Sequence, residues 1–411
     1  MRVIVVGAGI GGLTLAQALY NAGIDVVVHD RDPRVGTTGG YRIHLDDTAC
    51  AILRDHLPPA TFQALLASSP SRAAHRHISF ADHRLRVLSD TRIPPEEEML
   101  LVGRVPLRTL LAHGLDDVIR WGSDYVGHET RPDGTVTARF ADGSTDHGDV
   151  LVGADGSTSR VAAALAGRPM SAPVDIGGIA GRTPLTADIR EQLPAVLRGG
   201  SLLAVGPGGT SAFVTLHDTV PGPALDPALC TEVPAFTEPP AVYWGVNVTL
   251  DRLPDARRLG AEAAVRAAVA LLHAWSPVLR EIVSAVDPRT VGTFRYHACD
   301  PEAHLTPWPS GTVTALGDAV HAMPPTGGRA AATAIRDADL LAAHLTNAAK
   351  GLTTIPLGVH AYERGLTAYA ADAVRVSLKP LVWQRRLARP GVGGLARVAT
   401  TIAAPVAAAR R

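Results

Sequence analysis

The stretch VIVVGAGIGG, residues 3–12, decides the fold that this sequence predicts. Residues 3–6 form a short apolar run, which is typical of a central parallel strand buried on both faces. Gly7, Gly9 and Gly12 follow and lead into a helix, so backbone amides at the start of that helix can approach a pyrophosphate. The motif indicates a bound dinucleotide but does not distinguish NAD from FAD, and a glycine-rich turn without a ligand is the alternative.

The residues after this turn complete a βαβ unit. Leu15, Ala18, Leu19 and Ala22 recur at helical spacing, and Gly23 is placed to end the helix. The run IDVVVHDRDP, residues 24–33, predicts a second buried strand. Asp30 lies at the end of this strand, where it is placed to accept hydrogen bonds from ribose hydroxyls.

Two later segments repeat the pattern of a buried strand and a glycine turn. They are DVLVGADGSTSR, residues 149–160, and GTVTALGD, residues 311–318, so the nucleotide-binding sheet is assembled from distant parts of the chain. Upstream of the first, Asp-Gly pairs at 133–134 and 142–143 separate three β-rich runs and predict an antiparallel meander. Residues 175–300 carry glycine-interrupted β patterns and then a helix from about 261 to 272, which indicates an inserted β-rich domain.

Composition excludes several classes of function. The 411 residues favour two packed domains, and 39 basic against 39 acidic residues leave no charge excess for gripping nucleic acid. No segment reaches about 18 uninterrupted apolar residues, so we expect no membrane insertion. The first residues predict a strand and not a signal peptide, which favours a cytoplasmic protein. The widely spaced Cys50, Cys230 and Cys299 are interpreted as buried structural thiols.

Two further motifs narrow the class of protein. GADGSTSR places Asp155 and Gly156 at a strand end, and GDAVHAMPPTGG does the same for Gly317 and Asp318. With the amino-terminal glycine motif, the arginine of VGRVPLRTLL, the AWSPVLREIV segment and the closing YER helix, they give a sequence that resembles the single-component aromatic hydroxylase family of FAD-dependent monooxygenases. The resemblance covers nearly the whole chain.

The resemblance implies an α/β fold like that of p-hydroxybenzoate hydroxylase. It has a Rossmann-like FAD-binding domain with a three-stranded β-meander, a β-rich substrate domain and C-terminal helices. We expect the FAD-binding domain to comprise residues 1–70, 98–174 and 290–350. Residues 71–97 and 175–289 would form the substrate domain, and residues 351–411 the C-terminal helices, with one helix reaching Pro380 and continuing beyond it.

The resemblance also implies roles for individual residues. The three glycines of the first motif would hold the FAD pyrophosphate, and Asp30 and Arg31 the adenosine end. Arg104 would contact FAD, with a surface ion pair as the alternative, and Asp318 would bind the ribityl chain. Asp155 and Gly156 would contact both FAD and NAD(P)H. The full set of expected cofactor-binding residues is Gly7, Gly9, Gly12, Asp30, Arg31, Arg42, Arg104, Asp155, Gly156, Gly317, Asp318, Pro325, Gly327, Gly328, Ala330 and Ala331.

The stretch PPTGGRAAA, residues 324–332, predicts a second helix amino terminus at the cofactor. A helix starting near Gly327 or Gly328 would point free amides at the negative charge of reduced flavin. Relatives commonly carry a glycine and then an asparagine where this chain has Ala330 and Ala332. The amides survive this change, but an asparagine side-chain contact is lost.

The implied reaction is oxygenation of an aromatic or polycyclic small molecule. NAD(P)H would reduce FAD, O2 would form a C4a-(hydro)peroxyflavin, and one oxygen atom would pass to the substrate without a metal. A same-fold flavoprotein that does not oxygenate, such as a reductase, dehydrogenase or ring-forming cyclase with structural FAD, is the first alternative. A non-catalytic nucleotide-binding or partner-binding protein is the second alternative.

The substrate-side residues are less clear from the sequence. If GGYRIHL is a strand, Arg42 and His44 share one face, which looks either into the active site or onto a domain surface. Tyr243, Trp244, His297 and Trp308 line an aromatic pocket or belong to the core. For His321 we expect a structural role near the flavin. No general base is assigned.

Overall fold

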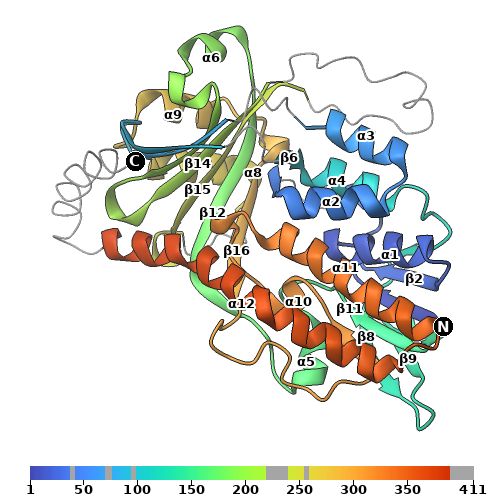
Figure 1. Ribbon diagram of the computed structural model, residues 1–411. Coiled ribbons are helices and arrows are strands. Elements are labelled where there is room, and N and C mark those ends of the chain that lie inside the picture. The colour runs from blue at the N-terminus through green and yellow to red at the C-terminus, as the bar shows by residue number, and fades with distance from the viewer. Residues whose placement is uncertain (38–41, 70–75, 94–98, 219–238, 254–258, 389–411) are drawn as a thin grey trace, which may run out of the picture.

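The structure is a computed structural model that describes residues 1–37, 42–69, 76–93, 99–218, 239–253 and 259–388. One layer of it is a five-stranded parallel sheet (Figure 1). In spatial order, its strands are β17 (Val313–Ala315), β11 (Val150–Gly153), β1 (Arg2–Val6), β2 (Asp25–Asp30) and β7 (Ile119–Trp121). All four strand pairs are parallel, which confirms the predicted Rossmann-like sheet.

The two faces of β1 bury different layers. Val3 and Val5 pack in a core with helices α1 (Ile10–Asn21) and α11 (Ala330–Ala349). Ile4 and Val6 face the opposite way and pack against the β-meander. Alternate side chains of a strand point to opposite faces, so an uninterrupted apolar run is what a strand covered on both sides requires.

The predicted meander is confirmed. Strands β8 (Tyr125–Thr130), β9 (Val136–Phe140) and β10 (Thr145–Gly148) pair antiparallel in sequence order. Gly134 and Gly143 have φ of 86° and 84° in the two turns, a region that suits glycine and explains both Asp-Gly pairs.

A seven-stranded sheet forms the second half of the fold. In spatial order its strands are β16 (Gly292–Ala298), β12 (Ala172–Pro184), β15 (Ala241–Thr249), β14 (Ser211–His217), β13 (Gly200–Val205), β4 (His77–Asp82) and β5 (Val87–Arg92). Helices α8 (Ala261–Leu271) and α9 (Pro277–Ser284) cover one face, where Trp244 and Val246 meet Ala268 and Ile282.

Strand β16 does not lie in the FAD-binding part of the fold, where the sequence analysis placed it. Residues 290–350 were expected with the FAD-binding segments, whereas β16 pairs antiparallel with β12 at the edge of the seven-stranded sheet. Strand pairing over more than a hundred residues leaves no local signal, so the sequence pattern identifies the strand but not its partner. The remaining domain boundaries stay a prediction.

Helix α12 (Ile355–Ala388) connects the two halves and, as expected, continues past Pro380. It packs on α11 and crosses the front of the molecule to the seven-stranded sheet (Figure 1). There Gln384 donates to the carbonyl oxygens of Gly209 (2.6 Å) and Asn247 (3.2 Å). The helix therefore links the parallel-sheet half of the fold to the seven-stranded sheet.

Shorter elements complete the described chain. The other helices are α2 (Asp47–His56), α3 (Pro59–Ala67), α4 (Arg104–Ala112), α5 (Arg160–Ala166), α6 (Ala187–Gln192) and α10 (Asp318–His321), and β3 (Arg42–Leu45) pairs with β6 (Leu100–Gly103). The 3-10 turns are η1 (Val35–Thr37), η3 (Ala195–Leu197), η4 (Pro207–Gly209), η5 (Leu250–Arg252), η7 (Pro288–Thr290) and η8 (Pro325–Gly327).

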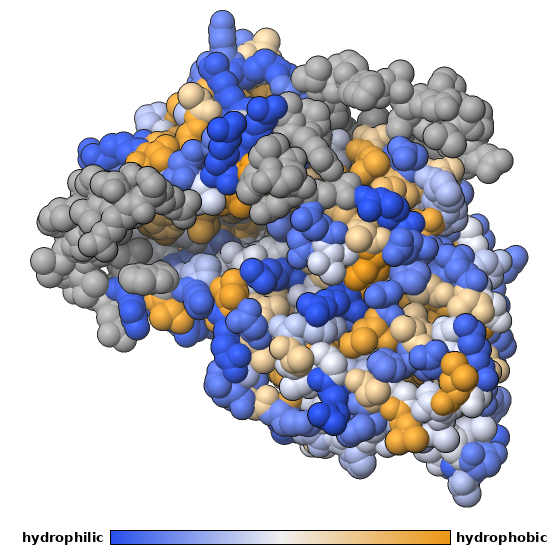
Figure 2. Space-filling view, viewed as in Figure 1, coloured by the Kyte–Doolittle hydropathy of each residue, from blue (hydrophilic) through white to orange (hydrophobic). Residues whose placement is uncertain are grey.

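Two of the three cysteines lie in the described residues, and both are buried as expected. Cys50 and Cys299 are buried thiols, and burial raises the pKa of Cys299 to about 12, whereas Cys230 lies outside the described residues. None of the helices in the described ranges has the length and apolar character needed to span a bilayer. The face in Figure 2 shows hydrophilic residues interspersed with hydrophobic ones.

Candidate cofactor site

Two adjoining cavities, of about 230 Å³ and about 540 Å³, lie at the carboxyl edge of the parallel sheet. The loops after β1, β2, β11 and β17 meet there, because the carboxyl ends of parallel strands share one edge. The cavities have lining residues in common, including Gly9, Arg104 and Gly156. Together they form an elongated binding space that suits a dinucleotide.

The structure brings nearly all the expected cofactor residues to this space. Gly12, Arg42, Gly317, Asp318, Pro325, Gly328, Ala330 and Ala331 line the smaller cavity. Gly7, Asp30, Arg31 and Asp155 line the larger one. Gly327 lines neither cavity and packs on Ser377 of α12, where an added Cβ would lie 2.4 Å from Oγ.

The three motif glycines serve different purposes. An added Cβ would lie 2.2 Å from the Ala154 carbonyl oxygen at Gly7, and 2.0 Å from the Gly7 carbonyl oxygen at Gly12. At Gly9 it would meet no protein atom within 4 Å, because Gly9 faces the two cavities. Gly7 and Gly12 thus allow the turn to close against the chain, and Gly9 leaves room for a ligand beside the start of α1.

Asp30 is held in a network that the sequence analysis missed. Its Oδ2 accepts hydrogen bonds from the Ala8 amide (2.6 Å) and the Arg108 guanidinium (3.1 Å), and its Oδ1 accepts from the Asp32 amide (2.8 Å). Arg108 also donates to the Ala8 carbonyl and to Asp32, both at 2.7 Å. Arg108 lies four residues after Arg104 on α4, so the two arginines share one face of the helix. This spacing is the feature of the sequence that could have indicated Arg108 as a second site residue.

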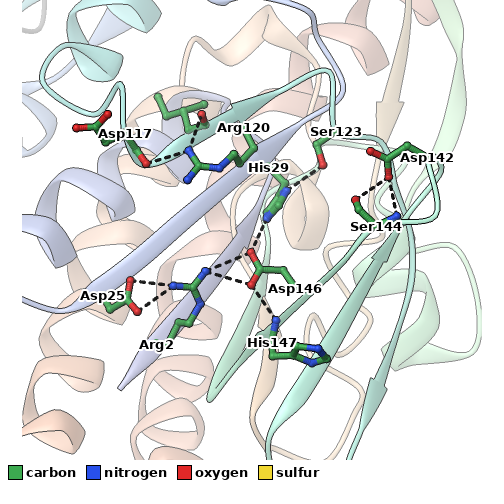
Figure 3. A network of polar contacts seen from close by, with 11 residues as sticks. Arg2, Asp25, His29, Asp117, Arg120, Ser123, Asp142, Ser144, Asp146 and His147 are labelled. Carbon is green, nitrogen blue, oxygen red and sulfur yellow. Dashed lines mark hydrogen bonds and ion pairs between the residues drawn. The ribbon is translucent and has the colours of Figure 1, made fainter.

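A second polar network, drawn in Figure 3, includes His29 and Ser123, which line the larger cavity. The His29 ring stacks on Phe140 at 4.0 Å, contacts the Ser123 hydroxyl at 2.9 Å and pairs with Asp146 at 3.0 Å. Burial alone would raise the pKa of Asp146, but hydrogen bonds from His29 and Arg2 lower it to about 2. The network fixes an imidazole ring in the cavity wall.

The Asp155 motif caps a helix. Its carboxylate accepts hydrogen bonds from the Ser159 hydroxyl and from the Arg160 amide (2.7 Å) at the start of α5. Burial nevertheless raises the pKa of Asp155. Gly156 follows with φ of 80° and open space around its Cα, so its backbone can approach a ligand closely.

The second helix amino terminus begins later than expected. Residues Pro325–Gly327 form the 3-10 turn η8, Gly328 takes φ of 64°, and α11 begins at Ala330. Two prolines and a left-handed glycine cannot continue an α-helix, so the first α-helical turn begins two or three residues later than expected. The amides of Ala330 and Ala331 still border the smaller cavity.

Asp318 faces the smaller cavity and is exposed to it, yet protein surrounds it on the other sides. Burial raises its pKa, and the positive charges of His321 and Arg104 oppose that effect. The cations therefore favour the ionised form of this carboxylate.

The substrate-side predictions divide into three outcomes. Arg42 and His44 both line the smaller cavity, and burial lowers the pKa of His44. The Arg42 guanidinium lies 4.9 Å from the Tyr243 ring centroid and hydrogen-bonds to His217, so it reaches the seven-stranded sheet. Trp244 and Trp308 are core residues, and His297 lines neither cavity.

The parallel sheet, the glycine turn and the paired cavities define a dinucleotide-binding α/β protein with a second β-sheet domain. Sequence profiles of known families agree with that class. The family described as FAD binding domain matches residues 280–377, and the family described as NAD(P)-binding Rossmann-like domain matches residues 5–55.

Comparison with known proteins identifies the family. The FAD-dependent monooxygenase dbaB of Emericella nidulans is 30% identical over 366 residues, which cover 84% of this chain and 86% of dbaB. A Photorhabdus luminescens crystal structure assigned as an FAD containing monooxygenase superposes with a TM-score of 0.77, at 31% identity over 92% of this chain and 97% of that one. The chain belongs to the family of FAD-dependent monooxygenases, which are flavoprotein oxidoreductases.

Two further relatives extend the comparison. The dual O-methyltransferase/FAD-dependent monooxygenase elcB of Phaeosphaeria nodorum is 30% identical, over 82% of this chain but only 39% of elcB. The chain therefore spans about two fifths of the length of this dual-function relative. Klebsiella pneumoniae HpxO, in complex with FAD and uric acid, shares the fold with a TM-score of 0.73 at 20% identity, over 98% of this chain and 97% of HpxO.

Proposed function

We propose that this protein uses NAD(P)H and O2 to oxygenate an aromatic or polycyclic small molecule. The observation that carries the proposal is the elongated space at the carboxyl edge of the sheet, lined by all three glycine-containing motifs. FAD bound there would take electrons from NAD(P)H and activate O2, so that one oxygen atom enters the substrate and the other leaves as water.

The larger cavity would hold the adenosine and pyrophosphate. Arg31, Arg104, Arg108 and Arg160 line it and supply positive charge for the phosphates. Open space at Gly9 brings the phosphates to the amino terminus of α1. Asp30 would accept a ribose hydroxyl while it keeps its bond to Arg108, because a carboxylate has about four acceptor positions.

The smaller cavity would hold the flavin. Asp318 would accept hydrogen bonds from the ribityl hydroxyls, and the amides of Ala330 and Ala331 would face the ring. The amino terminus of the 20-residue helix α11 stabilises negative charge beside it by roughly 0.3–2 kcal/mol. Reduced flavin carries such charge, so this helix favours the reduced state.

The substrate would bind between the smaller cavity and the seven-stranded sheet. Arg42 reaches from the cavity to His217 and Tyr243, and this combination of a cation and two rings suits an aromatic molecule with an acidic oxygen. The HpxO complex with uric acid supports a compact ring system as the substrate class. No residue of this face is assigned as an acid or base.

The first test is the visible absorption spectrum of the purified protein, with the released cofactor identified by mass. We expect stoichiometric FAD. NAD(P)H oxidation and oxygen uptake are then measured with phenols, aromatic carboxylates and polyketide-like polycycles, and at least one should stimulate both. A colourless protein that cannot be reconstituted with FAD would contradict the cofactor assignment. Bound FAD without oxygen uptake for any compound would favour a non-oxygenating reductase, dehydrogenase or cyclase.

A further inference from the structure

A buried ion pair lies directly behind the turn of Gly317 and Asp318. The His321 Nε2 and the Asp337 Oδ2 are 2.6 Å apart, and both side chains are fully buried. The same oxygen accepts the Gly317 amide at 2.9 Å, and the other carboxylate oxygen accepts the Tyr369 hydroxyl at 2.6 Å. One carboxylate therefore joins the turn to α10, α11 and α12.

The charges around this pair favour the protonated form of His321. Burial alone would lower its pKa, but the Asp337 charge, their hydrogen bond and the Asp318 charge together raise it. The other charged or titratable groups that interact with Asp337 or with Asp318 are Arg104 on α4, Cys299 after β16, and Tyr362 and Tyr369 on α12. Behind them, Arg336 and Asp339 act on Tyr369, and Glu363 acts on Tyr362. Within the described residues, His321 is the cation that contacts Asp337.

We propose that His321 is a positioning residue for the cofactor: held by Asp337, its imidazolium fixes the Gly317–Asp318 turn and stabilises the negative charge of Asp318. This inference rests on the proposed FAD site. The pair does not face either cavity, so it would act on the cofactor only through the turn and through Asp318. Without the cation, burial would favour the neutral form of Asp318, which is a weaker acceptor for a ribityl hydroxyl.

His321→Gln tests the proposal, with FAD affinity of the apoprotein measured by quenching of flavin fluorescence over a range of pH. We expect FAD to bind about tenfold more weakly than to the unmodified protein at neutral pH. The direction in which FAD affinity changes with pH distinguishes the two proteins. In the unmodified protein, affinity falls as pH rises through the raised pKa of His321. In H321Q this alkaline loss is absent, and affinity falls instead as pH decreases and Asp318 takes up a proton.

A matched control uses Asp339, which lies on α11 as Asp337 does. His56 and Asp339 form a pair of similar length, 2.7 Å, but it is partly exposed and far in sequence from the turn. His56→Gln should leave FAD affinity and its pH profile unchanged. Thermal unfolding of each apoprotein separates a loss of binding from a loss of folding.

Removing one partner of a buried pair can prevent folding. The double variant His321→Gln with Asp337→Asn leaves no unpaired buried charge and keeps polar groups at both positions. It should fold and still bind FAD more weakly, without the alkaline loss. Unchanged affinity and an unchanged pH profile in the folded variants would overturn the inference alone. If the unmodified protein binds no FAD, both the proposed function and this inference fail.

Discussion

Glycines in one motif have different physical roles at the residue scale. Gly12 is required by the chain itself, because its Cα lies against the Gly7 carbonyl. Gly9 has extended backbone angles that any residue adopts, φ of −75° and ψ of −176°, and no protein atom near its Cβ direction. A side chain at position 12 would therefore interfere with folding, and a side chain at position 9 with ligand binding.

Gly9→Ala and Gly12→Ala test this distinction as a pair. For Gly9→Ala we expect a loss of only about 0.5 kcal/mol in apoprotein stability, because alanine is a poorer N-cap than glycine, but a marked loss of FAD affinity, because the new methyl group enters the cavity. Gly12→Ala should lower both, by about 1–3 kcal/mol in stability, since the Cβ overlaps a carbonyl oxygen. Urea unfolding and FAD titration measure the two effects. Equal losses of stability would contradict the assignment.

Arg108 shows how one side chain organises the larger cavity. It is 4% exposed and pairs with Asp30 and Asp32 while it holds the Ala8 carbonyl. Arg108→Ala would leave the buried Asp30 carboxylate without its guanidinium partner. We expect a loss of about 3 kcal/mol or more in the free energy of unfolding, measured with urea.

Arg139→Ala is the control for that experiment. Arg139 makes an exposed ion pair with Glu129 at 3.5 Å, and such pairs contribute at most about 1 kcal/mol. A loss from Arg108→Ala no larger than that of the control would show that the buried network contributes little.

At the scale of elements, helix α12 supports the loop beside the smaller cavity. Pro380 has no amide hydrogen, so the carbonyl of residue 376 receives no intrahelical hydrogen bond from it, although the helix continues. At the adjacent Ser377, the carbonyl accepts the Thr326 hydroxyl at 2.6 Å, and Gly327 packs against the same residue. The loop position is thus set by a helix about fifty residues further along the chain.

Gly327→Ala should disturb this contact. Its Cβ would lie 2.8 Å from the Ser377 Cα, so the loop and α12 must separate, at a cost of about 1–3 kcal/mol in stability. FAD affinity should fall as well, because Pro325 and Gly328 of this loop line the cavity. Gly260→Ala is the control, since its Cβ meets nothing within 4 Å. Equal thermal unfolding of the two variants would disprove the packing role.

On the scale of the whole molecule, Asp146 connects the β-meander to the five-stranded parallel sheet. Its carboxylate on β10 bonds to Arg2 of β1 and His29 of β2, so it ties the meander to the parallel sheet (Figure 3). Its pKa of about 2 lies below the value of about 3.9 in an unfolded chain. The stabilisation is therefore present above about pH 4 and is lost as pH falls toward about 2.

Asp146→Asn measures this linkage. Relative to the unmodified protein, we expect a loss of roughly 2 kcal/mol in the free energy of unfolding at neutral pH. That difference should shrink as pH falls through the interval between the two pKa values. Urea unfolding across this pH range tests it, and a difference that does not depend on pH would rule out the charge of Asp146 as the cause.

The sequence by itself determined the local parts of this protein. An apolar run before Gly7, Asp-Gly pairs in the meander turns and a glycine after the strands β1, β11 and β17 are conformational requirements met within a few residues, so they predicted the sheet and the edge at which the two cavities lie. Only the tertiary structure decided that β16 joins the seven-stranded sheet, that Arg108 holds Asp30, and that His321 pairs with Asp337 behind the turn. Those contacts join residues that are distant in sequence or lie on different elements, and burial makes them favourable only when the whole chain has folded.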